Sequence, residues 1–157
     1  FSFGKTYHCT GWKLGYCIAP THLMKEFKKV HQFNAFCCDT PKQVALADYI
    51  LHTEAYTELG KDMQRRRDHL AKGLELLPWK PIASHGSYFQ CFAIGNSVSD
   101  KVFAEQLVKE AGVATIPVSA FYNKGDDFGI IRLCFAKKIE TLDAAIERLV
   151  RWNQKKY

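Results

Sequence analysis

Two lysines stand eight residues apart in the segment SFGKTYHCTGWKLG, residues 2–15. In a fully extended chain, this spacing would separate Lys5 and Lys13 by roughly 26 Å. A turn signal lies between them at Thr10 and Gly11, because glycine accepts backbone angles that are closed to other residues. We therefore expect the chain to fold back here and to bring both amines toward one small anionic ligand.

The small residues beside the lysines extend this chemistry. Gly4 is expected to leave free space against Lys5, and Ser2 adds a hydroxyl close by. A lysine that forms a Schiff base, a second lysine for a phosphate and a hydroxyl donor together suit pyridoxal phosphate. The alternative is a pair of solvent-exposed lysines in an ordinary hairpin, which describes most lysines taken singly.

The run SFGKT followed by TGWKLG resembles the cofactor-lysine signature of fold-type I, class I/II aminotransferases. It looks most like the branch that contains kynurenine, glutamine/phenylpyruvate and methionine aminotransferases. Three later segments follow in the order that the resemblance implies: GSYF at 86–89, IPVSAFY at 116–122 and IRLCF at 131–135. The resemblance covers essentially the whole chain and corresponds to the C-terminal part of such an enzyme.

The resemblance implies transamination between an α-amino acid (methionine, aromatic, glutamine or kynurenine) and a 2-oxo acid in a cytoplasmic homodimer. Lys5 would be the Schiff-base lysine and proton shuttle, and Lys13 stands where many members carry arginine. In the family, the residues that hold the pyridine ring lie upstream of this motif, so the chain alone is expected to be inactive. Two alternatives stay open: β-elimination from cysteine conjugates on the same scaffold, and a non-catalytic dimerisation or binding module.

Arg132 is the only charged residue in the apolar run IIRLCF. A charged side chain in an apolar strand needs a partner, and a guanidinium can hold a carboxylate through two parallel hydrogen bonds. An internal Asp or Glu is one candidate partner, and the substrate α-carboxylate, which the resemblance implies, is the other. Phe36 and Tyr122 are weaker candidates for lining a substrate pocket, with core packing as the alternative.

The bulk composition is that of a globular protein. The chain has 157 residues, of which 47% are hydrophobic and 24% charged, and its net charge is +6. The densest basic run, residues 65–67, follows Asp62 at helical spacing, so we expect a solvated helix face and no nucleic-acid site. No apolar run reaches membrane-spanning length, and no signal peptide is recognised.

The cysteines do not predict a metal site, since no His/Cys cluster has zinc spacing. Most of the six lie in apolar segments, where we expect reduced thiols that behave as small hydrophobic side chains in a cytosolic protein.

The elements that must position these residues predict an α/β protein. We expect a strand over 14–19, helices over 21–33, 40–52, 54–77 and 99–111, strands over 87–94, 113–118 and 130–135, and a final helix from about residue 140. Thr40 is the expected cap of the second helix, with Gln43 completing a capping box. By resemblance, residues 1–58 end a large cofactor-binding domain, and 59–157 form a linking helix and a small C-terminal domain.

Overall fold

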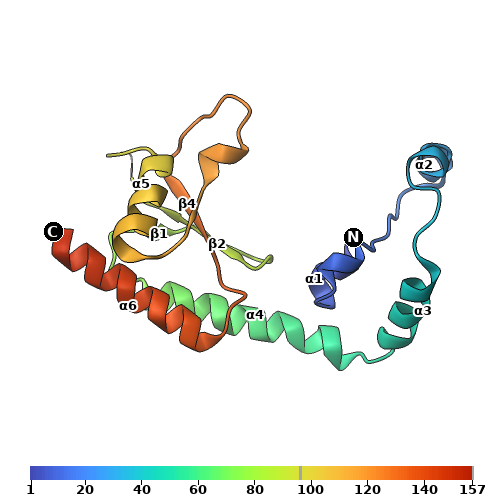
Figure 1. The fold of residues 1–157 in the computed structure, drawn as a ribbon, viewed down its shortest axis with the longest axis horizontal. Helices are drawn as coiled ribbons and strands as arrows, with labels where there is room; N and C mark the ends of the chain where they lie inside the picture. Colours follow the sequence, from blue (N-terminus) through green and yellow to red (C-terminus); the bar gives the residue numbers. More distant parts are fainter. Residues whose placement is uncertain (96, 157) are drawn as a thin grey trace. The chain divides into compact units, whose positions relative to one another are not determined.

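The computed structural model describes residues 1–95 and 97–156, and it divides into two compact units. Unit 1 is Phe1–Lys61 and unit 2 is Asp62–Tyr157 (Figure 1). The boundary falls within α4 (Glu54–Gly73), the long helix that the sequence predicted from Glu54 onward. The mixture of helices and an antiparallel sheet confirms the expected α/β class.

Unit 1 begins with a chain reversal built from α1 (Phe3–Thr6) and η1 (Thr10–Trp12). Phe1 and Tyr16 exchange two backbone hydrogen bonds, of 2.8 and 3.0 Å. Gly15 permits this approach, because a Cβ at that position would lie 2.5 Å from the Phe1 carbonyl oxygen. The expected reversal is therefore present.

The residues that make the reversal differ from those predicted. His8 and Lys13 adopt the left-handed conformation, with φ of 55° and 56°, while Gly11 does not. The strand expected over 14–19 is reduced to a single bridge between Ser2 and Gly15. A strand needs a hydrogen-bonded neighbour, and within the described residues only the first residues of the chain supply one.

Two further helices follow in unit 1, α2 (Thr21–Asn34) and α3 (Thr40–Tyr49). The prediction of α2 is confirmed to within one residue. The cap of α3 is Asp39 and not Thr40, since the Asp39 carboxylate accepts a 3.0 Å hydrogen bond from the Lys42 amide. The Gln43 side chain donates to the Cys38 carbonyl at 3.0 Å and so forms no capping box with Thr40.

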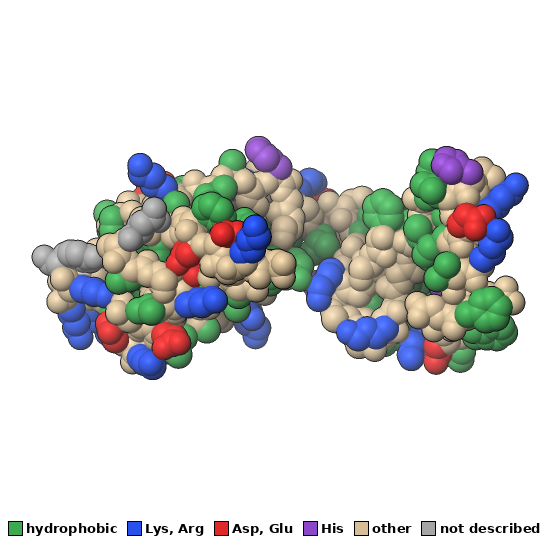
Figure 2. All heavy atoms as spheres, turned by 90° about the horizontal axis from the view of Figure 1, so that it is seen from above, with side chains coloured by type: hydrophobic (Ala, Val, Ile, Leu, Met, Phe, Trp, Pro, Cys, Tyr) green, Lys and Arg blue, Asp and Glu red, His purple; other side chains and the backbone are tan. Residues whose placement is uncertain are grey.

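Unit 1 has almost no core of its own. Within its described residues only Gly4, Leu14 and Leu46 are buried. Large apolar side chains remain at its surface, as Figure 2 shows in green. Those from α2 and the residues just after it are Leu23, Phe27, Val30, Phe33 and Phe36. The low burial also explains why Cys17 and Cys37 are exposed, although most cysteines were expected to behave as small hydrophobic side chains in apolar segments.

Unit 2 is built on a four-stranded antiparallel sheet in the order β1-β2-β4-β3. Its strands are β1 (Lys80–Pro81), β2 (Phe89–Ala93), β3 (Ile116–Pro117) and β4 (Ile130–Cys134). β2 is an interior strand, since it pairs with both β1 and β4. Side chains alternate along both central strands, so that one face of the sheet is buried and the other half-buried.

Helices cover the buried face of the sheet. They are α4, α5 (Asp100–Gln106) with its π-helical continuation η2 (Leu107–Ala111), and α6 (Ile139–Lys156). Gly112 ends the α5–η2 segment, with φ of 66°, so the segment ends at the residue expected from the sequence, Ala111. Within unit 2 this packing forms one core cluster: Leu70, Leu74, Leu77, Trp79, Phe92, Leu107, Val113, Ile131, Leu133, Phe135, Leu142, Leu149 and Trp152.

Residues 1–95 and 97–156 contain neither a membrane-spanning helix nor a metal-binding group of side chains. No helix there is both long and apolar enough to cross a membrane. No group of three or more His, Cys, Asp or Glu side chains is arranged to hold a metal ion.

Candidate active site

Lys5 lies in the last turn of α1, with its side chain exposed. Gly4 beside it is buried, and a Cβ at Gly4 would lie only 3.0 Å from the Thr10 Cα. The Thr10 hydroxyl donates to the Gly4 carbonyl at 3.1 Å. The prediction that Gly4 leaves free space beside Lys5 is therefore wrong. Gly4 lets the backbone of η1 pack against the helix that carries Lys5.

Lys13 and Ser2 are brought near each other along the chain reversal. Lys13 ends η1 in the left-handed conformation, two residues before Gly15, which bridges to Ser2. Ser2 precedes α1, but its side chain makes no capping hydrogen bond to that helix. Among the described residues, no carboxylate lies within ion-pair distance of Lys13, and the first acidic residue of the chain is Glu26.

These groups fit pyridoxal phosphate in their chemistry. The segment offers one amine for the aldehyde, a second cation for the phosphate and a hydroxyl that α1 does not use. No acidic residue precedes Glu26 in the sequence, so the segment itself carries only positive side-chain charge, which favours an anion. The assignment of Ser2, Lys5 and Lys13 to the cofactor stays a prediction.

Three tyrosine rings, which the sequence did not predict to meet, pack together next to the end of α1. The Tyr7 ring packs edge-on against Tyr49 at 5.9 Å and against Tyr56 at 6.1 Å between ring centroids. Desolvation within the cluster, and then the neighbouring Tyr56 hydroxyl, raise the pKa of Tyr7 above its ordinary value. Tyr7 follows α1 directly, so the cluster ties the Lys5 segment to α3 and to the start of α4.

Phe36 lies in unit 1, just past the end of α2. The amides of Ala35 and Phe36 both donate to the His31 carbonyl, at 3.0 and 2.9 Å. Phe36 adopts φ of 61°, where glycine is usual, and its side chain is 76% exposed. Core packing, the alternative considered from the sequence, therefore does not hold Phe36 within unit 1.

Arg132 lies on β4 in unit 2, opposite Cys91 on β2 and on the half-buried face of the sheet. Its guanidinium carbon lies 3.9 Å from the ring centroid of Phe89 and 4.8 Å from that of Phe121. Burial raises the pKa of the Cys91 thiol, and the positive charge of Arg132 opposes this rise. The site thus combines a fixed cation with aromatic and weakly polar walls.

The charge of Arg132 has no internal counter-ion in the described part of the chain. No Asp or Glu lies within 4.0 Å of its guanidinium, and its buried Nε has no hydrogen-bond partner there. The internal acid considered from the sequence is therefore not found among these residues. A half-buried guanidinium with unused donors is suited to accept a carboxylate from a ligand.

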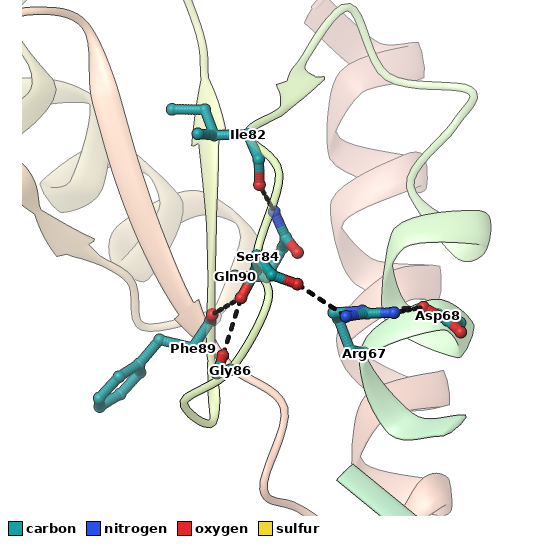
Figure 3. Close-up of polar contacts among 7 residues, drawn as sticks. All are labelled: Arg67, Asp68, Ile82, Ser84, Gly86, Phe89 and Gln90. Atoms are coloured by element: carbon teal, nitrogen blue, oxygen red, sulfur yellow. Dashed lines mark hydrogen bonds and ion pairs between the residues drawn. The ribbon is translucent and has the colours of Figure 1, made fainter. Parts of the chain in front are cut away.

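A polar network holds the hairpin that carries Phe89 (Figure 3). The Ser84 hydroxyl donates to the Phe89 carbonyl at 3.4 Å, and the Gln90 side chain donates to the Ile82 carbonyl at 2.7 Å. From α4, Arg67 donates to the Ser84 carbonyl at 2.7 Å. No sequence pattern predicts this network, because its partners come from segments that meet only in the folded unit.

Tyr122 also lies in unit 2, directly after Phe121. Its ring packs edge-on against Phe128 at 5.3 Å, and its side chain is 45% exposed. The structure thus places Tyr122 next to a residue that contacts Arg132. Its role in binding substrate, like that of Phe36, stays a prediction.

Comparison with known proteins gives one consistent family. The family described as aminotransferase class I and II matches residues 1–149. Methionine aminotransferase of Escherichia coli (strain K12) is 43% identical over 151 residues, which cover 94% of this chain and 39% of that protein. Human kynurenine–oxoglutarate transaminase 1 is 34% identical over 177 residues, covering 97% of this chain and 42% of that protein.

The solved structures agree with the sequence relatives. The crystal structure of YbdL from Escherichia coli, reported with a methionine aminotransferase function, superimposes with a TM-score of 0.89 at 42% identity. The match covers 96% of this chain and 40% of that one. The chain therefore spans about two fifths of the length of the relatives that it matches.

Proposed function

Because the chain belongs to the class I and II aminotransferase family, we propose that it is the C-terminal part of an enzyme that transfers an amino group from an α-amino acid to a 2-oxo acid. In this proposal, residues 1–58 end a large cofactor-binding domain, and 59–157 form the linking helix and a small domain. We call the protein of the relatives' full length that contains this chain the complete enzyme. The chain alone would be inactive.

The cofactor of the proposed reaction is pyridoxal phosphate, for which Ser2, Lys5 and Lys13 supply fitting groups. When bound, the cofactor supplies an electron sink for the carbanion that remains after the substrate loses its α-proton. The Lys5 amine would take that proton from the α-carbon and later give it to a carbon atom of the cofactor, as transfer of the amino group requires. Lys13 and Ser2 would fix the phosphate, one as a point charge and the other as a hydrogen-bond donor.

The proposed substrate class rests on the surroundings of the Arg132 guanidinium. This guanidinium is half-buried, lies against Phe89 and Phe121, and has no carboxylate partner among the described residues. We assign it to the α-carboxylate of the amino acid, which would be held by two parallel hydrogen bonds. Phe36 and Tyr122 would line the pocket for an apolar or aromatic side chain, as in methionine, an aromatic amino acid, glutamine or kynurenine.

The proposal extends to assembly and compartment. Leu23, Phe27, Val30 and Phe33 are exposed along α2, and several large exposed apolar side chains on one element are typical of a surface that contacts another part of the protein. In a homodimer this surface would be covered by the rest of the large domain and by the second copy. Six free cysteines are compatible with a reducing cytoplasm.

Borohydride reduction of the complete enzyme, followed by peptide mass mapping, tests the cofactor assignment. The expected result is the mass of a pyridoxyl group on the peptide that contains Lys5, and loss of transamination in Lys5→Arg. Lys25→Arg is the matched control, since it changes a lysine of α2 and should keep both the label and the activity. An unlabelled Lys5 in an active preparation would contradict the proposal.

A further inference from the structure

We propose that Asp100 is a positioning residue for Arg132, acting through Ser119 and Phe121 on the guanidinium that receives the substrate carboxylate. The inference rests on the proposed function of Arg132. Asp100 lies 32 positions before Arg132 in the chain, and its carboxylate oxygens bond to Ser119 and not to the guanidinium.

Asp100 is fully buried, with 0% of its surface exposed. One carboxylate oxygen accepts the Ser119 backbone amide at 2.7 Å, and the other accepts the Ser119 hydroxyl at 2.5 Å. Both oxygens are therefore committed to one residue of η3 (Val118–Phe121). A buried carboxylate is costly unless it is fully hydrogen-bonded, so this clamp is a strong constraint on the position of η3.

Helix capping does not explain the clamp. Asp100 is the first residue of α5, but the cap of that helix is Ser99, whose hydroxyl accepts the Val102 amide at 3.3 Å. The side chain of Asp100 is turned to Ser119, 19 residues further along the chain. Its effect on local structure is thus exerted on η3 and not on its own helix.

The backbone of Asp100 fixes the other end of the same loop. Its amide donates to the Asp127 carboxylate at 2.9 Å, and the second Asp127 oxygen accepts the Gly129 amide at 2.8 Å. Gly129 immediately precedes β4, the strand that carries Arg132. Asp100 therefore joins η3 and the start of β4 to a single point in the fold.

Phe121, the last residue of η3, connects the position of η3 to Arg132. Its ring centroid lies 4.8 Å from the Arg132 guanidinium carbon, yet 62% of the Phe121 side chain is exposed. So exposed a ring has little packing of its own to hold it in place. The backbone two residues before it, at Ser119, is what Asp100 anchors. Loss of this anchor should free the ring and loosen the guanidinium.

The test uses the complete enzyme with methionine as the donor. Steady-state kinetics give kcat and KM. Inhibition by 4-(methylthio)butanoate, which is methionine without its amino group, measures binding of the carboxylate and side chain without the reaction of the amino group. In Asp100→Ala we expect KM and the inhibition constant to rise about tenfold and kcat to change less than about twofold, because two hydrogen bonds to Ser119 are lost. Ser119→Ala keeps the hydrogen bond from the backbone N–H of residue 119 to Asp100 and should raise KM and the inhibition constant only about threefold.

Asp100→Asn should restore values near those of the wild type. An amide oxygen can accept the Ser119 N–H, and the amide N–H can donate to the Ser119 hydroxyl oxygen. A role limited to general stability would reduce the amount of active enzyme, so Asp100→Ala would lower the apparent kcat and leave KM and the inhibition constant unchanged. Glu105→Ala is the matched control, since it removes an exposed carboxylate from the same helix and should change neither constant.

Arg132→Lys separates the failure of this inference from failure of the proposed function. If Arg132→Lys raises both constants while Asp100→Ala and Ser119→Ala behave like Glu105→Ala, the inference is wrong and the proposed function stands. If Arg132→Lys itself leaves both constants unchanged, the carboxylate assignment of Arg132 is wrong, and the inference falls with it. If Asp100→Ala does not fold, Ser119→Ala with Asp100→Asn gives the same decision.

Discussion

The guanidinium carbon of Arg132 lies 3.9 Å from the ring centroid of Phe89, on the neighbouring strand of the sheet in unit 2. In the strand register Phe89 pairs with Cys134, so the ring lies diagonally across from Arg132 on the same face. This relation places a cation over an aromatic face at a site where the cation has no internal carboxylate among the described residues. The ring thus orients a charge whose hydrogen-bonding capacity remains free for a ligand.

Replacing Phe89 with leucine should weaken carboxylate binding. The cation–π contact is lost while apolar volume is largely kept, and such contacts contribute about 0.5–2 kcal/mol, or roughly a two- to thirtyfold rise in KM. Steady-state kinetics of the complete enzyme measure this change. Phe89→Tyr keeps the ring and should stay within about twofold of the wild type. Equal KM values in the leucine and tyrosine variants would show that the ring contact does not matter.

Local patterns predicted much of the fold. The bounds of α2 follow from its apolar spacing and from Pro20, and Gly112 ends the segment that begins at Asp100, because such signals act over a few residues. Local patterns do not decide which of two neighbouring polar residues caps a helix. Thr40 was predicted to cap α3, but Asp39 does so. The strand expected over 14–19 failed for a different reason, since the described chain offers it too few partner residues.

The candidate site was predictable where its residues share one motif. Lys5 and Lys13 stand in a single short segment, and Arg132 is conspicuous as a charge in an apolar strand. The contacts that hold these residues were not predictable, because Phe89 and Asp100 reach them through strand register and loop packing. Such contacts depend on which segments meet in the folded unit, and no local pattern records that.

Replacing Phe36 with glycine should raise the stability of the protein and lower its activity. Phe36 adopts φ of 61°, and the left-handed region costs a non-glycine residue about 1–2 kcal/mol. In the complete enzyme, Phe36→Gly should therefore raise the thermal midpoint of unfolding, while kcat/KM falls if the ring lines the substrate pocket. The matched control is Phe33→Gly, which lies inside α2 and should lower stability by about 1 kcal/mol. A Phe36→Gly variant that keeps full activity would remove Phe36 from the pocket.

Asp62 should make the stability of unit 2 depend on pH. A hydrogen bond from Arg66, and then one from Arg65, lower the pKa of Asp62 below its ordinary value. A carboxylate whose pKa is lower in the folded state stabilises the fold above the unfolded-state pKa, and this contribution is lost as pH falls through the folded-state pKa. Arg66 also donates to the Lys137 carbonyl, so the ion pair fixes a contact outside α4.

Denaturant unfolding of wild type and Asp62→Asn checks this sign. We expect the variant to be less stable at pH 7, with the difference shrinking below about pH 4 as the wild-type carboxylate becomes protonated. Glu58→Gln is the control, since its pair with Lys61 is exposed and should contribute little at either pH. A difference between wild type and Asp62→Asn that is the same at pH 7 and pH 3 would contradict the assignment.

The two units should differ in stability when the 157-residue chain is studied alone. Unit 2 encloses a cluster of thirteen buried apolar residues, whereas the described part of unit 1 buries only Gly4, Leu14 and Leu46. A 14-residue helix such as α2 is marginal in water without tertiary packing. Hydrogen–deuterium exchange followed by mass spectrometry should show slow exchange in β2 and β4 and fast exchange in α2 and α3. Protection of α2 equal to that of β4 would mean that unit 1 is stabilised by contacts other than its own buried side chains.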